Sequence, residues 1–369
     1  MTVRMGSMML ISMLPAVLAC REEMAEAADP SKASSSGAVT IDSRPARTLP
    51  GSGEEGRTLI ENGVDATVLN SGQMAVADYG ASGIQLFDGS GRHIRQIGRR
   101  GRGPGEFRSV DLVHNCAHEG IVVWDRLQGE LSVLDSAGAV ASRTRLPGGP
   151  MEVHCAGPGR VVILTTPLAV GRPSAESPVF HGGILLATTS GDSIGSLGIV
   201  SLGPNRPLTG TTTLAVTATQ VFAGIADSGI VRVLAMNGDT VGQFNVGDRT
   251  RPATPAHYEA AIDRLVAPMT VASERDDMKS RLLEIERPAQ LPAFRALRTD
   301  PAGRLWAVTS PLGEAVTELQ VYDASGKHLG EVRLPFEVDV YEVGADYILG
   351  AYEAADGYHV VVYRYEARS

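Results

Sequence analysis

The chain has 369 residues, of which 43% are hydrophobic and 5% aromatic, with 42 glycines and 21 prolines. Such a chain can bury a large core while it uses many residues in turns, so one large domain is expected rather than two. The formal net charge of -9 argues against nucleic acid as a partner, because nonspecific binding to phosphates needs a basic surface.

The first residues have the features of a bacterial export signal. Arg4 precedes an apolar run over residues 5–19 that is too short to span a bilayer as a helix of the mature protein. Residues 17–20 (VLAC) resemble a lipobox, so Cys20 is predicted to carry the lipid of an extracytoplasmic, membrane-anchored lipoprotein. In the alternative, cleavage after residues 25–27 (AEA) releases a soluble secreted or periplasmic protein.

The segment that follows the signal peptide is rich in Ala, Ser and Glu. Residues 21–37 are therefore expected to form a flexible tether between the signal peptide of residues 1–20 and a folded domain of residues 38–369. The membrane is expected to be contacted through the lipid anchor only.

Five look-alike segments then follow one another along the chain. In each, an apolar strand-like run precedes a glycine in a short turn, where only Gly or Asn adopts a left-handed backbone at low cost. A second apolar run lies upstream, as in residues 74–77 before the run of residues 84–87. Each segment therefore predicts three or four antiparallel strands. The five turn glycines are Gly91, Gly138, Gly191, Gly238 and Gly326.

The spacing of these glycines gives the number of units. They lie 47, 53, 47 and 88 residues apart, which corresponds to one propeller blade each, with an insertion in the last gap. A sixth blade is predicted from the apolar runs of residues 347–349 and 360–363, but the sequence ends at Ser369 before a fourth strand can form. Residues 38–42 have the alternation to supply that strand and to close an all-β, six-bladed β-propeller.

Two motifs support this architecture by resemblance. Residues 98–107 (GRRGRGPGEF) and 299–306 (TDPAGRLW) resemble bacterial six-bladed β-propeller proteins related to NHL repeats, and the resemblance covers residues 38–369. It implies an extracytoplasmic propeller, while the function of such proteins depends on sites that the blade pattern does not specify. The third unit departs from the pattern with a Pro- and Ser-containing excursion over residues 167–178.

Two further cysteines occupy equivalent places in consecutive units. Cys116 and Cys155 each precede the next apolar strand by about five residues, so a disulfide between blades 2 and 3 is predicted in an oxidising compartment. Two free buried thiols are one alternative. Another is a metal site, because His114, Cys116 and His118 alternate along one strand face, with His154 nearby.

The most basic segment contains the candidate ligand-binding residues Arg99, Arg100 and Arg102 among several glycines. Exposed backbone amides between arginines could receive a carboxylate or phosphate from a ligand or a lipid headgroup. The alternative is a structural crossover between blades 1 and 2, with Phe107 wedged between the blades and solvated arginines.

Three aspartates are further candidates for ligand binding. Asp78 and Asp125 end equivalent strands 47 residues apart, and Asp111, like Asp300, lies in a crossover or turn. Calcium-dependent sugar lactonases place carboxylates at the central channel of a propeller, whereas aspartates that cap turns are the structural alternative. No cofactor is predicted. Ca²⁺ or another divalent cation is expected only if the protein is an enzyme.

The insertion near residues 254–286 has a helical pattern. Thr254 with Pro255 predicts the start of one helix, and Ser273 with Glu274 predicts the start of a second. The pair is expected to bury its apolar stripe against its own propeller, and the alternative is burial against a partner. As a lid it would favour a small-molecule site, and as a docking surface it would favour a protein partner.

Together these features predict a monomeric, exported propeller for binding or scaffolding at the cell envelope. Its partner would be a protein or a small-molecule ligand at the propeller face. The alternative is a metal-dependent enzyme, a lactonase-like hydrolase or a lyase, that uses the central channel.

Overall fold

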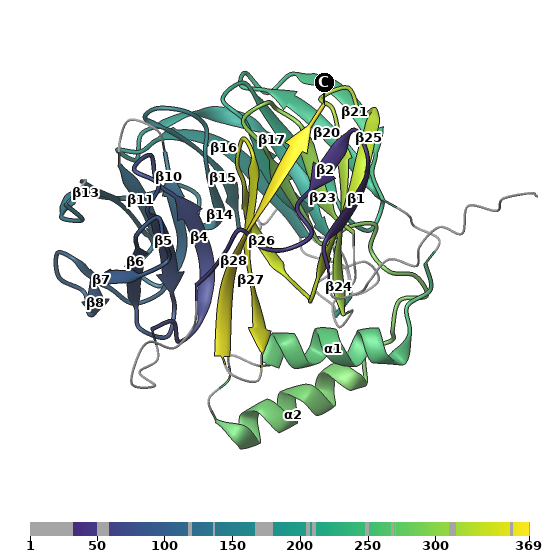
Figure 1. Ribbon diagram of the computed structural model, residues 1–369, viewed down its shortest axis with the longest axis horizontal. Coiled ribbons are helices and arrows are strands. Elements are labelled where there is room, and N and C mark those ends of the chain that lie inside the picture. Colours follow the sequence, from purple (N-terminus) through teal and green to yellow (C-terminus); the bar gives the residue numbers. More distant parts are fainter. Residues whose placement is uncertain are drawn as a thin grey trace, which may run out of the picture.

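The computed structural model describes residues 32–49, 59–116, 120–135, 137–166, 180–203, 207–208, 212–247, 251–266, 269, 271–309, 315–354 and 357–368. It shows six antiparallel sheets arranged as the blades of a propeller, together with two helices on one face (Figure 1). The expected six-bladed β-propeller is confirmed. The predicted signal peptide, Cys20, His118 and residues 167–178 lie outside the described residues.

The first three blades each contain four strands in chain order, from the inner to the outer strand. Blade 1 comprises β4 (Gly63–Val68), β5 (Met74–Asp78), β6 (Gly83–Phe87) and β7 (His93–Ile97). Blade 2 comprises β10 (Val110–Asn115), β11 (Ile121–Asp125), β12 (Glu130–Leu134) and β13 (Val140–Arg145). Blade 3 comprises β14 (Pro150–Cys155), β15 (Arg160–Thr165), β16 (Phe180–Thr188) and β17 (Ser193–Gly203).

The other three blades complete the ring. Blade 4 comprises β18 (Thr212–Val216), β19 (Gln220–Ile225), β20 (Ile230–Ala235) and β21 (Thr240–Asn245). Blade 5 comprises β22 (Ala296–Thr299), β23 (Leu305–Val308), β24 (Val316–Tyr322) and β25 (His328–Pro335), with β1 (Ser34–Gly37) outside them. Blade 6 comprises β26 (Asp339–Val343), β27 (Tyr347–Ala354), β28 (Gly357–Ala367) and β2 (Val39–Ile41), and β3 (Arg47–Leu49) also pairs with β28.

Closure of the ring follows the predicted route. Strand β2 pairs with β28 through Val39 opposite Ala367 and Ile41 opposite Tyr365. The end of the segment expected as a tether is itself a strand, because Ser34–Gly37 pair with β25 from Ser34 opposite Arg333 to Gly37 opposite Gly330. A side chain at position 37 would meet the Leu329 carbonyl oxygen at 2.5 Å, so this close approach requires glycine.

Burial changes with distance from the propeller axis. Every residue of the second strands β5, β11 and β23 is buried, which explains their continuous apolar runs, because neighbouring blades cover both faces. The outer strands β7, β13 and β21 are mostly exposed and polar. The five turn glycines join the third and fourth strands with positive φ values from 77° to 95°, as predicted.

The core consists of six hydrophobic clusters, one between each pair of adjacent blades. One of them closes the ring, since Leu349 and Val360 of blade 6 pack with Met74 and Val76 of blade 1. The blades are therefore held together by apolar contacts between their faces rather than by backbone hydrogen bonds.

The insertion forms the expected helical pair, α1 (Pro255–Val266) and α2 (Ala272–Leu283). The Thr254 hydroxyl accepts a hydrogen bond from the His257 amide at 3.2 Å, which confirms the first helix start. The expected start at Ser273 is wrong, because α2 begins at Ala272 after Val271, which makes no side-chain cap. Helix α1 lies against the propeller and α2 lies beyond it (Figure 1).

Neither helix of the described region has the length and apolar content needed to cross a membrane. The two helices are joined by Tyr258 of α1, whose hydroxyl lies 3.0 Å from the Leu282 carbonyl oxygen and 2.8 Å from the Ile285 carbonyl oxygen. The side chains of α1 reach the core, whereas no residue of α2 is buried.

Candidate functional site

The predicted aspartates hold backbone turns in place. Asp78, which is fully buried, accepts hydrogen bonds from the amides of Glu61 (3.1 Å) and Asn62 (3.0 Å). Asp125 does the same in blade 2, where it accepts from the amides of Arg108 (2.6 Å) and Ser109 (3.2 Å). Each carboxylate therefore fixes the segment that enters the inner strand of its own blade.

Two other carboxylates have similar local bonds. Asp111 accepts hydrogen bonds from the Arg126 amide at 3.2 Å and from its Nε at 3.1 Å. Asp300 accepts from the Trp306 indole at 2.9 Å. In the described part of the chain, no three His, Cys, Asp or Glu side chains are grouped so that they could hold a metal ion.

The basic segment contains an internal carboxylate ligand. Strand β8 (Arg99–Arg100) pairs in parallel with β9 (Glu106–Phe107), and Phe107 is fully buried. Glu106 accepts hydrogen bonds from Arg99 Nε at 3.0 Å and from the amides of Arg102 (3.0 Å) and Gly103 (2.9 Å). Arg100 donates to Ser82 Oγ at 3.2 Å. The amides that could receive an anion thus already bind the carboxylate of Glu106.

The two cysteines form the predicted disulfide between blades 2 and 3, with Cα atoms 5.7 Å apart. The inner strands β10 and β14 bring Cys116 and Cys155 together at the same end of the channel. His154 Nε2 lies 3.1 Å from a carboxylate oxygen of Glu152 on its own strand. The thiol of Cys116, which the alternative metal site with His114 and His118 would need as a ligand, is therefore part of the disulfide.

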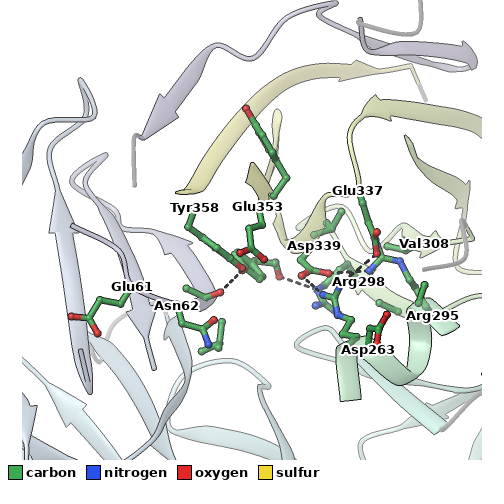
Figure 2. Close-up of a pocket in the computed structure, with 18 residues that line it drawn as sticks. Glu61, Asn62, Asp263, Arg295, Arg298, Val308, Glu337, Asp339, Glu353 and Tyr358 are labelled. Atoms are coloured by element: carbon green, nitrogen blue, oxygen red, sulfur yellow. Dashed lines mark hydrogen bonds and ion pairs between the residues drawn. The ribbon is translucent and has the colours of Figure 1, made fainter. Parts of the chain in front are cut away.

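A pocket of about 910 Å³ lies where the inner strands of blades 5, 6 and 1 begin (Figure 2). Because the segments that connect successive blades lie on this side, we call it the crossover face. Helix α1 covers part of the opening with Ala260, Asp263 and Arg264. The remaining polar lining residues are Glu61, Asn62, Arg295, Arg298, Glu337, Asp339, Tyr341, Tyr352, Glu353 and Tyr358.

Two of the three arginines in the pocket are paired with carboxylates. Arg264 of α1 contacts Glu337 at 3.3 Å and also Asp339. Arg295 contacts Asp339 at 3.0 Å and donates to the Val338 carbonyl at 2.8 Å. These ion pairs attach α1 to blade 6 and compensate both guanidinium charges.

Arg298 differs from these two arginines. Its Nε donates to the Tyr341 carbonyl at 2.9 Å and its Nη1 to the Leu297 carbonyl at 2.8 Å. Among the described residues, no carboxylate lies within ion-pair distance of this guanidinium. Burial lowers the pKa of Arg298, although the carboxylates of Asp65, Glu152 and Asp339 act against this from further away. Arg298 is thus a half-buried cation whose hydrogen bonds go to neutral carbonyl groups.

The channel beside Arg298 contains titratable side chains on neighbouring inner strands. Burial raises the pKa of Asp65 to about 7, although the carboxylate accepts a hydrogen bond from the Val113 amide at 2.9 Å. Burial lowers the pKa of His114 to about 3, and the nearby charges of His154 and Arg298 act in the same direction. Near neutral pH, Asp65 is therefore only partly ionised, and its charge acts on Arg298 without a direct ion pair.

Two tyrosines form a hydrogen-bonded chain at the side of the pocket. Tyr341 Oη lies 2.9 Å from the Gly63 carbonyl oxygen and 2.6 Å from Tyr358 Oη. A carbonyl can only accept, so Tyr341 donates its single proton to Gly63 and Tyr358 donates its own to Tyr341. Glu353 lies directly opposite Tyr358 across the β27–β28 hairpin.

The sequence-predicted candidates Arg99, Arg100, Arg102, Asp78, Asp111 and Asp125 do not line this pocket. Sequence reasoning missed the residues that do, above all Arg298, Tyr341 and Tyr358. One signal was present, because an arginine follows Leu297 within a short apolar strand near the start of blade 5. An arginine in the inner strand of a blade, beside the buried Leu297, is a residue type that is rarely enclosed without a partner.

Comparisons with other proteins identify the fold. A predicted exported protein from Bacteroides fragilis aligns with a TM-score of 0.55 at 12% identity, over 90% of this chain and 96% of that one. A member of the DUF4221 family from Bacteroides vulgatus aligns with a TM-score of 0.53 at 11% identity, over 90% and 99%. A virginiamycin B lyase from Staphylococcus aureus aligns with a TM-score of only 0.43 at 11% identity, over 88% and 99%, which is too weak to bear on activity.

No protein-family model matches the chain, and no curated protein sequence matches it either. At identities of 11–12%, the structural similarities show a shared architecture and nothing finer. The chain is a six-bladed β-propeller whose fold is similar to that of exported and DUF4221 proteins of Bacteroides.

Proposed function

We propose that this protein is an exported propeller that binds a small molecule in the pocket on its crossover face, and that Arg298 receives an anionic group of that ligand. The observation that carries the proposal is the environment of Arg298, which is half-buried at the pocket and has no ion-pair partner among the described residues. A half-buried guanidinium without a directly paired carboxylate is costly, and a carboxylate or phosphate of a ligand would supply the missing ion pair.

The size and cover of the pocket support a small ligand. A volume of about 910 Å³ is in the range of small-molecule sites, and α1 narrows the opening through its ion pairs with blade 6. A partner that reaches Arg298 through this pocket would have to enter beside α1, which lines it. Binding to a small molecule is therefore favoured over scaffolding.

An extracytoplasmic location is part of the proposal. The disulfide between Cys116 and Cys155 supports an oxidising compartment, since cytosolic thiols are kept reduced. The similarity to a predicted exported protein is consistent with this location. We further propose that Cys20 anchors the protein to a membrane, which mass spectrometry of the native protein would test through the lipid mass on that cysteine.

Calorimetric titration with acetate, caproate and inorganic phosphate tests the anion site. We expect at least one of these anions to bind the wild-type protein. Arg298→Gln should weaken that binding at least about tenfold, because charge-assisted hydrogen bonds are lost, while Arg298→Lys keeps the charge and should retain part of the affinity. Arg281→Gln on the exposed helix α2 is the matched control and should bind like wild type. Unchanged binding by a folded Arg298→Gln protein would exclude this function for the pocket.

A further inference from the structure

The tyrosine pair gives one end of the pocket a defined hydrogen-bonding polarity. Tyr341 and Tyr358 both direct their protons along the chain that ends at the Gly63 carbonyl. Burial is the main reason that the pKa of Tyr358 is raised to about 12, and the charge of the nearby Asp339 acts in the same direction. This phenol therefore stays neutral at physiological pH. Its proton is committed to Tyr341, and the remaining lone pairs on Tyr358 Oη can only accept a hydrogen bond.

Glu353 adds negative charge at the same end. It faces Tyr358 as its direct cross-strand neighbour in the β27–β28 hairpin, where side chains are close enough to bind one group together. Glu353 is exposed, and no hydrogen bond or ion pair joins its carboxylate to the described residues. Both lie beside the pocket in Figure 2, so this end presents two acceptors, while the nearby Arg264 is already paired with Glu337 and Asp339.

The acceptor end and Arg298 are connected through a single residue. The carbonyl of Tyr341 accepts from Arg298 Nε, while its hydroxyl belongs to the tyrosine chain. The two ends are therefore separated by about the length of one tyrosine side chain and line the same pocket. One small ligand can reach both if its charged groups are several bonds apart.

Building on the proposed function, we propose that the ligand is zwitterionic, with a primary ammonium group bound by Glu353 and Tyr358 Oη and an anionic group bound by Arg298. An ammonium supplies only donors, which matches the acceptors at one end, and a carboxylate supplies only acceptors, which matches the guanidinium at the other. The chemical class is that of ω-amino acids rather than simple carboxylic acids or simple amines.

Three probes of equal chain length test this class by calorimetric titration: ε-aminocaproate, caproate and n-hexylamine. We expect ε-aminocaproate to bind at least about threefold more tightly than caproate, because an ion pair of an exposed carboxylate contributes modestly. n-Hexylamine should bind more weakly than either. Equal binding of caproate and ε-aminocaproate would overturn the zwitterion proposal and leave the anion site intact. Failure of both carboxylates to bind would overturn the zwitterion proposal, whereas the use of Arg298 as an anion site would be overturned only if phosphate also failed to bind.

Variants separate the two ends. Glu353→Gln should remove most of the preference for ε-aminocaproate over caproate, because it deletes the carboxylate charge that would pair with the ammonium. Tyr358→Phe should lower the same preference, because it deletes the acceptor oxygen and leaves the ring. Glu284→Gln, an exposed glutamate at the end of α2, is the matched control. A preference that persists in both Glu353→Gln and Tyr358→Phe would show that these residues do not bind the ammonium.

Discussion

Val39 of β2 pairs with Ala367 of β28, so a strand from the beginning of the folded domain forms the outer edge of the last blade. The same strand covers part of β28 that would otherwise be an open sheet edge, and β3 covers another part through Leu49 opposite Val360. Because the strands of the closing blade come from both ends of the domain, the fold depends on contacts between its first and last residues.

A proline in the closing strand should destabilise the whole propeller. Thr40 lies between two buried residues of β2 opposite Glu366, and its side chain is exposed. Thr40→Pro removes a ladder donor and should lower the free energy of unfolding by about 2 kcal/mol in urea denaturation. Thr40→Ala, which keeps the donor, should stay within about 0.5 kcal/mol of wild type. Equal stability of the two variants would contradict the role of β2 in closure.

The disulfide should contribute measurably to stability. It links residues 39 positions apart, and the chain-entropy model gives about 3 to 4 kcal/mol for a loop of this length. Guanidinium unfolding with and without reductant measures the contribution. Reductant should destabilise wild type but not the double variant Cys116→Ala, Cys155→Ala, which controls for other effects of the reductant. A wild-type protein indifferent to reductant would disprove this contribution.

Asp65 and His114 should give the stability opposite dependences on pH. The pKa of Asp65 is raised from 3.8 to about 7, so its stabilising contribution is fully present below about pH 4 and is lost as the pH rises to 7. The pKa of His114 is lowered from 6.5 to about 3, so its contribution is present above about pH 6.5 and is lost as the pH falls. Between about pH 4 and 6.5 the two effects oppose each other.

Single variants should expose each effect in urea unfolding measured over this pH range. Asp65→Asn leaves the histidine effect, so the variant should become more stable as the pH rises from about 4 to 6.5. His114→Asn leaves the carboxyl effect and should become less stable over the same range. The double variant should show neither slope. If the single variants follow the wild-type profile, the two groups do not titrate as stated.

At position 336, a glycine variant should be more stable than an alanine variant, which is the reverse of the usual order. It lies beside the pocket with a φ of 74° and is 47% exposed, and its ring stacks on Tyr352 at a centroid distance of 4.4 Å. Phe336→Ala loses the stacking and keeps the strained backbone, whereas Phe336→Gly loses the stacking and relieves the strain. The glycine variant should therefore be more stable than the alanine variant by about 1 kcal/mol in thermal unfolding. The opposite order would show that the backbone is not strained there.

Much of the fold could be predicted because it depends on local patterns that repeat. Buried second strands read as continuous apolar runs, turn glycines have positive φ, and one missing strand at the end of the sequence matches one spare strand near its start. The pairing of Cys116 with Cys155 followed from their equivalent positions in adjacent blades. The strand β1 was missed, because its sequence (SSSG) has no apolar alternation.

The candidate site depends on a different kind of information. Arg298 lies on blade 5, while Tyr341, Glu353 and Tyr358 lie on blade 6, and their relation depends on the register of each strand and the placement of both blades around the axis. Asp78 and Asp125 seemed available for ligands in the sequence, yet each binds amides of a neighbouring segment. Periodicity and composition thus specify the blades, their number and their closure, because these follow from local backbone preference and burial. Only the tertiary structure determines which charged groups have partners and which line the same pocket, because these relations depend on contacts between segments that are distant in the sequence.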